Sequence, residues 1–143
     1  MAVMNRKRSA FLRYPQKMKS FLMFTAIVEG LTGLALMGFP SRVVMLLLGS
    51  ALIGPASFIV SIIAGAAIFS LAIICWLLKE NRDASPVIKM LTFYNLSVSI
   101  IFLLGVFNYG LNSAVLWLVT GFHLFQAVRG IIIIQKKKSI QRS

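Results

Sequence analysis

Four long apolar runs divide the chain, and short polar stretches separate them. The runs cover residues 21–39, 57–78, 90–107 and 113–134. Each has about the length, roughly 20 residues, that a helix needs to cross a bilayer. Backbone polar groups in lipid must bond within their own segment, so runs of this length predict helices and exclude a barrel. The sequence therefore predicts an all-α, polytopic membrane protein with a four-transmembrane-helix bundle over residues 20–135.

The apolar segment 43–78 is too long for a single membrane helix. One straight helix of this length would extend about 54 Å, against a hydrocarbon core of about 30 Å. Gly49, Gly54 and Pro55 interrupt the segment. We therefore expect a short interfacial or re-entrant helix over residues 43–53, between the first and second spans.

Basic residues gather in alternate connections between the runs. The segment 1–19, the loop 79–89 and the segment from Arg129 onward carry six, three and five Lys or Arg residues. Of the two other connections, residues 40–56 carry only Arg42, and residues 108–112 carry no Lys or Arg. By the positive-inside rule, this distribution predicts that both termini and the loop 79–89 are cytoplasmic. A fifth crossing within the second run would put the C-terminal lysines outside, against the same rule.

The two ends of the chain are expected to lie outside the bundle. Residues 1–19 are expected to form a basic cytoplasmic arm on the membrane surface, with any helix interrupted at Pro15. Residues 136–143 are expected to form a basic cytoplasmic tail. Tyr94, among other aromatic residues, falls near the end of its predicted span, where amphipathic rings are favoured.

Composition agrees with this location. Hydrophobic residues make up 59% of the chain and charged residues 13%, against about 45–50% and about 25% in soluble domains. The net charge of +12 favours attraction to anionic lipid headgroups at the cytoplasmic face, and nucleic-acid binding is not expected. A lone cysteine, Cys75, excludes an intrachain disulfide and is typical of a small buried hydrophobe.

Small and polar residues recur at spacings of three and four in each run, so each set lies on one helical face. Such faces suit contacts between helices in lipid. In chain order the sets are Thr25, Glu29, Thr32 and Gly33; Ser57, Ser61, Gly65, Ala72 and Cys75; Thr92, Asn95 and Ser99; and Ser113, Thr120, His123 and Gln126. The candidates for a polar site inside the membrane are Glu29, His123, Asn95, Thr32, Thr120 and Gln126.

Glu29 and His123 are the residues that could carry chemistry. Glu29 lies near the middle of the first run, where a charge is costly, so it should face the bundle and be protonated or paired. Two interpretations stay open for Glu29: a proton-linked or ligand-binding carboxyl, and a neutral group that holds helices together. His123 lies at a similar depth in the fourth run, and a contact between the two would form a proton relay.

Patterns for catalysis and metal binding are weak. The Ser, His and Asp residues form no triad-like arrangement, and no phosphate-binding loop is present. Glu29, Cys75 and His123 are a poor ligand set for zinc. We expect no enzyme, no catalytic residue, no metal and no cofactor, with haem or a chlorin on His123 as the alternative. Arg129, about one turn from the end of its run, is expected to snorkel to the interface.

Several short segments carry a resemblance to a known group. They are 29–36 (EGLTGLAL), Pro40, 46–49 (LLLG), Tyr94-Asn95 and Phe122-His123. Over most of residues 20–135 the chain resembles small uncharacterised four-helix proteins of bacterial inner membranes, with the general layout of DoxX-like membrane proteins. The resemblance implies a bacterial inner (cytoplasmic) membrane and a compact four-helix bundle. It implies no activity and assigns no functional residue.

Three functions compete at this point. The first is an accessory or structural subunit of a larger membrane complex, with other membrane subunits or copies of itself as partners. The second is a small homo-oligomeric transporter or channel, proton-linked through Glu29 and His123, in which residues 49–55 break a helix. The third is a binder of a lipid, quinone or pigment, with Trp117 and His123 lining a groove. Architecture alone does not choose among them.

Overall fold

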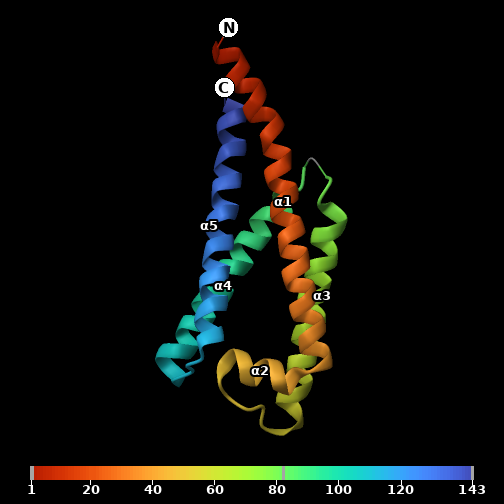
Figure 1. Cartoon of the computed structure of the whole chain (residues 1–143), viewed down its shortest axis with the longest axis vertical. Coiled ribbons are helices and arrows are strands. Elements are labelled where there is room, and N and C mark those ends of the chain that lie inside the picture. Colours follow the sequence, from red (N-terminus) through yellow and green to blue (C-terminus); the bar gives the residue numbers. More distant parts are fainter. Residues whose placement is uncertain (1, 82, 143) are drawn as a thin grey trace.

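The computed structural model describes the backbone of residues 2–81 and 83–142, and the side chains of residues 16–81, 83–137 and 139. These residues form five helices and no strand (Figure 1). The helices are α1 (Ala2–Gly38), α2 (Pro40–Leu48), α3 (Gly54–Leu78), α4 (Ser85–Tyr109) and α5 (Ala114–Arg142). Four segments are long and apolar enough to cross a membrane: Gln16–Gly38, Gly54–Leu78, Ser85–Tyr109 and Ala114–Lys137. The predicted all-α fold of four long apolar helices with a short helix after the first is confirmed.

Proline and glycine set the ends of the short helix α2. Pro40 occupies its first turn, where the missing backbone N–H has no partner to lose. Gly49 ends it in the left-handed conformation, with φ 69°, which glycine adopts at little steric cost. The helix therefore covers Pro40–Leu48 rather than the predicted 43–53.

The first helix continues through Pro15. The backbone of α1 stays helical from Ala2 to Gly38, so the expected interruption at Pro15 was wrong. A proline removes one hydrogen bond of the helical ladder and can bend a helix without ending it. The side chains of residues 1–15 lie outside the described ones, and the surface position of the basic arm stays a prediction. At the other end, α5 runs on to Arg142.

The long helices form two pairs. α1 packs along α3, and α4 packs along α5. The pairs approach each other at the end of the bundle that holds both termini, and they diverge toward the other end (Figure 1). Contacts between α1 and α5 join them, and α2 lies across the diverging end, in contact with α1, α3 and α5.

Gly33 and Gly65 bring the backbones of α1 and α3 into contact. A Cβ atom added at Gly33 would lie 2.7 Å from the carbonyl oxygen of Gly65 and from the backbone nitrogen of Phe69. One added at Gly65 would lie 2.9 Å from the carbonyl oxygen of Gly33. Helices in lipid associate through such small residues, because close backbone approach increases van der Waals contact. Gly33 and Gly65, one member of each predicted small-residue face, therefore lie at the contact between the first two spans.

Ser113 fixes the end of α2 to the start of α5. Its hydroxyl donates to the carbonyl oxygen of Leu47 at 2.6 Å and accepts from the backbone N–H of Leu116 at 2.9 Å. The first bond satisfies a carbonyl at the C-terminal end of α2, and the second satisfies an N–H in the first turn of α5. One hydroxyl thus caps two helices and holds α2 across the bundle.

The basic segments meet at the end of the bundle that holds the termini. Lys19 of α1 pairs with Glu80 at 2.6 Å, and Lys137 of α5 pairs with Asp83 at 2.7 Å. Both acids lie in the loop between α3 and α4 (Figure 1). The hydrogen bond and the charge of Lys137 hold the pKa of Asp83 below its ordinary value. These contacts bring α1, the loop and α5 together at one end, which we call the basic end.

The outer faces of the long helices are apolar. Leu77, Phe93, Phe107 and Leu118 are 72%, 72%, 76% and 73% exposed. Contiguous apolar surface on this scale is rare on soluble monomers and marks contact with a partner or with lipid. The four apolar helices are consistent with an integral membrane protein.

Candidate functional site

Polar side chains from three helices are buried inside the bundle. Each is at most 6% exposed, and together they are Thr25 and Glu29 of α1, Asn95 and Ser99 of α4, and Thr120, His123 and Gln126 of α5. We call this group the polar interior. Buried polar groups are costly unless they are hydrogen-bonded, and in lipid water does not supply the partner. The partner of each group therefore indicates what the group does.

Glu29 faces α4 and has a weak partner there. The hydroxyl of Tyr94 donates to Oε2 of Glu29 at 3.5 Å, which is long for a bond between two oxygens. Of the basic groups that the structure describes, none forms an ion pair with Glu29. A carboxylate without a counter-ion is expensive in hydrocarbon, so these surroundings suit the protonated form.

His123 and Asn95 form the shortest contact between helices in the polar interior. Nδ1 of His123 lies 2.7 Å from Oδ1 of Asn95, and Nδ2 of Asn95 donates to the carbonyl oxygen of Leu91 at 2.7 Å. The Leu91 carbonyl can only accept, so the Asn95 amide must present its oxygen to the imidazole. Nδ1 of His123 then carries the hydrogen and donates. In the neutral ring, Nε2 is left as the acceptor.

Aromatic rings surround the imidazole of His123. The ring centroids of Tyr94, Phe102 and Phe122 lie 5.9, 6.2 and 5.5 Å from that of His123, at angles of 81°, 63° and 75° between ring planes. Such edge-to-face contacts favour one ring orientation. The imidazole is therefore held by one hydrogen bond and by aromatic packing.

Tyr94 lies between Glu29 and His123. Within the described part of the chain, no hydrogen bond or ion pair joins the carboxyl to the imidazole, so the direct contact considered from their depth does not form. Tyr94 and Asn95 are consecutive on α4, and one step turns a side chain by about 100° around the helix. Tyr94 consequently reaches Glu29 on α1 while Asn95 reaches His123 on α5.

A second polar contact joins α1 to α5. Nε2 of Gln126 donates to the hydroxyl oxygen of Thr25 at 3.2 Å, and Arg129 donates to Oε1 of Gln126 at 2.9 Å. The guanidinium also lies 5.6–5.9 Å from the ring centroids of Phe21, Phe24 and Phe125.

Arg129 reaches back along α5 and does not snorkel toward its C-terminal end as expected. Helical side chains incline toward the N-terminus of their helix, which directs the guanidinium to Gln126. The charge of Arg129 is therefore held against the polar interior and the surrounding aromatic rings.

The hydroxyls of Thr120 and Ser99 bond within their own helices. Thr120 donates to the carbonyl oxygen of Leu116 at 2.7 Å, and Ser99 donates to that of Asn95 at 2.8 Å. These local bonds satisfy the two buried groups and add no bond between helices.

Thr32 is exposed, unlike the other candidates. Its neighbour Gly33 faces α3. Successive residues of a helix point about 100° apart, so Thr32 points away from α3. Thr32 therefore does not belong to the polar interior.

Sequence reasoning missed Tyr94 as a member of the site. It placed the ring near a span end because the third apolar run begins at residue 90. α4 instead begins at Ser85, with Pro86 in its first turn, so Tyr94 lies deeper and is partly buried. The Ala84-Ser85-Pro86 helix start was the signal that could have corrected the boundary.

The described residues contain no group of three His, Cys, Asp or Glu side chains that could hold a metal ion. Cys75 is buried and free. The side chains of Glu29, Tyr94 and His123 can form hydrogen bonds and exchange protons.

No family model matches the chain, and no curated protein or solved structure matches it. The resemblance to DoxX-like membrane proteins therefore stays a prediction.

Proposed function

We propose that this chain is a non-enzymatic accessory or structural subunit of a larger membrane complex. The observation that carries the proposal is that the side chains of the polar interior bond to one another across helices or to the backbone of their own helix. Asn95 with His123 and Gln126 with Thr25 bond one helix to another, and Ser99 and Thr120 bond locally. In a catalytic or ligand site, polar groups converge on open space.

The two cavities described in the structure lie elsewhere. They begin at the basic end, the second extends along α1 to Ile27, and neither is lined by Glu29, Asn95 or His123. The polar groups of the interior bond to one another or to the backbone of their own helix instead, as expected of groups whose role is to hold helices together.

The surface of the bundle supports an assembly role. α3 and α4 follow each other in the chain but make few contacts, so each helix pair keeps a long apolar flank. Lipid or the helices of a partner can cover such flanks, and an accessory subunit uses the second option. In the part of the chain that the structure describes, α2 and short connections are all that lies outside the long helices.

We place the protein in a bacterial inner membrane with the basic end in the cytoplasm. Every Lys and Arg except Arg42 belongs to the N-terminal arm, the α3–α4 region or the end of α5, and the positive-inside rule puts these segments in the cytoplasm. A reporter that is active only in the cytoplasm, fused after Ser143, should be active. Activity of a periplasm-specific reporter at the same position would contradict the assignment.

Co-purification from the native membrane tests the subunit role. A tagged chain extracted in a mild detergent should bring a larger membrane protein with it in a fixed ratio, measured by native mass spectrometry. The variant Glu29→Gln keeps the shape and hydrogen-bonding capacity of the side chain, and it should keep the same partner. A monodisperse homo-oligomer with no partner would refute the proposal.

A proton-linked transporter is the second candidate, and one observation favours it. Glu29 is buried and has no counter-ion among the side chains that the structure describes. Tyr94 places a hydroxyl on the carboxyl and its ring against His123. Carboxyl, phenol and imidazole can each exchange a proton. The test is proton flux in liposomes: a transporter requires flux in the wild type and a large loss in Glu29→Gln. Equal flux in the two would remove the carboxyl from any mechanism.

A further inference from the structure

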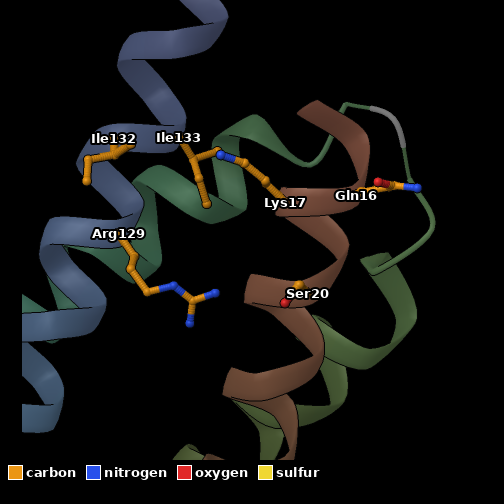
Figure 2. A pocket seen from close by; sticks show the side chains of 6 residues that line it. All are labelled: Gln16, Lys17, Ser20, Arg129, Ile132 and Ile133. Carbon is orange, nitrogen blue, oxygen red and sulfur yellow. The ribbon is translucent and has the colours of Figure 1, made fainter. Parts of the chain in front are cut away.

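A groove separates α1 from α5 at the basic end (Figure 2). Its volume is about 400 Å³, within the range of small-molecule sites. It is lined by Gln16, Lys17, Ser20, Arg129, Ile132 and Ile133. Figure 2 shows Lys17 extending from α1 toward Ile133, and Arg129 extending from α5 toward Ser20. The groove thus receives positive charge from both helices.

Arg129 has no acidic partner in the part of the chain that the structure describes. The chain has three acids: Glu80 and Asp83 pair with lysines, and Glu29 accepts from Tyr94. The guanidinium is half-buried and bonds to the neutral amide of Gln126. A cation beside apolar rings near the end of a membrane span favours an external anion, because no internal charge compensates it.

An apolar groove adjoins the first one. It measures about 440 Å³ and is lined by Gln16, Lys19, Ser20, Met23, Phe24 and Ile27. These positions follow one face of α1 from the basic end toward the middle of the span. Gln16 and Ser20 line both grooves, so the groove that holds Lys17 and Arg129 continues into an apolar strip.

We infer that the two grooves together bind one anionic phospholipid of the cytoplasmic leaflet. The phosphodiester lies between Arg129 and Lys17, and an acyl chain follows Met23, Phe24 and Ile27. A guanidinium matches phosphate oxygens with two parallel hydrogen bonds, and an ammonium supplies a second charge. Basic pockets between membrane helices on the cytoplasmic side suit acidic headgroups. The apolar strip favours a lipid over free phosphate, and the cationic lining disfavours a headgroup that carries its own positive charge.

This inference goes beyond the subunit role, and the isolated full-length chain tests it without any partner. Native mass spectrometry would compare the retention of phosphatidylglycerol with that of phosphatidylcholine carrying the same acyl chains. The wild type should retain phosphatidylglycerol about tenfold more. Arg129→Gln should lose about tenfold in that retention, the scale of a charge-assisted double hydrogen bond. Lys136→Gln removes an exposed charge on the same helix outside both grooves and should have no effect.

A second variant guards against a folding defect in Arg129→Gln. Ser20 is exposed and lines both grooves, so Ser20→Leu fills the space and leaves every charge in place. It should also lose phosphatidylglycerol while keeping the helical circular dichroism of the wild type. Excess inorganic phosphate should not displace the lipid. Equal retention of the two lipids, unchanged binding in Ser20→Leu, or displacement by phosphate alone would each overturn the inference.

Discussion

Gly33→Ala introduces a methyl group where the backbones of α1 and α3 come into contact. The new carbon would lie 2.7 Å from the carbonyl oxygen of Gly65 and from the backbone nitrogen of Phe69. Real Cβ atoms essentially never come within 3.0 Å of such atoms. Both neighbours belong to the backbone of α3 and cannot rotate aside, so α1 and α3 must move apart.

The expected change in the free energy of unfolding is the cost of overpacking less the gain in helix propensity. Overpacking a well-packed contact costs about 1–3 kcal/mol, and a rigid neighbour places the cost near the upper end. Separation by about 0.5–1 Å also forfeits a quarter to a half of the dispersion energy of each affected atom pair. Alanine regains about 0.8–1 kcal/mol over glycine within a helix. We expect a net loss of about 2 kcal/mol in the free energy of unfolding.

Gly121→Ala is the matched control. Gly121 lies inside α5, and a Cβ atom there would meet nothing within 4 Å. The same substitution should therefore leave stability unchanged or raise it by up to about 1 kcal/mol. Equilibrium unfolding in mixed micelles, monitored by circular dichroism, measures the free energy of unfolding of both variants. If Gly33→Ala proved as stable as Gly121→Ala, the close packing of α1 on α3 would be refuted.

Three further predictions concern other contacts. Ser113→Ala removes the hydroxyl that caps α2 and α5, and the same unfolding assay should show a loss of about 1 kcal/mol in the free energy of unfolding. Ser113→Thr should restore most of that loss, and failure to do so would argue against capping. Asn95→Leu leaves Nδ1–H of His123 without its acceptor and should cost about 1–3 kcal/mol, and nitrogen NMR should show the ring losing its Nδ1–H tautomer. A retained tautomer would contradict the assigned hydrogen bond. The lowered pKa of Asp83 means that its pair with Lys137 stabilises the fold above the ordinary aspartate pKa of 3.8 and that this contribution disappears as the pH falls through the lowered value. Because Asp83 is exposed, this contribution is small, and Lys137→Gln should lower the free energy of unfolding at neutral pH only slightly. A large loss would show that the loop contact is stronger than a surface ion pair.

Hydrocarbon thickness explains why the helices were predictable. A span needs a continuous apolar run of nearly fixed length, and a local pattern suffices to find it. The inward faces were also predictable, because helical periodicity groups Thr25 with Glu29, and His123 with Gln126, whatever the neighbouring helix is.

The partners of these groups depended on helix order, which local patterns do not encode. α1 packs along α3 and reaches Tyr94 of α4, so Glu29 meets a phenol rather than His123. The Tyr94 position followed from a helix start at Ser85 that hydropathy did not mark. Pro15 was misjudged because a proline can be accommodated within a helix when flanking turns continue.

Membrane fractionation tests most directly the claim that hydrocarbon surrounds the four long helices. Lysed cells would be washed with alkaline carbonate in the absence of detergent and centrifuged at high speed. The chain should stay entirely in the membrane pellet and be released only by detergent, because its apolar outer faces have no partner in water. Recovery of the folded chain in the carbonate supernatant would contradict the account.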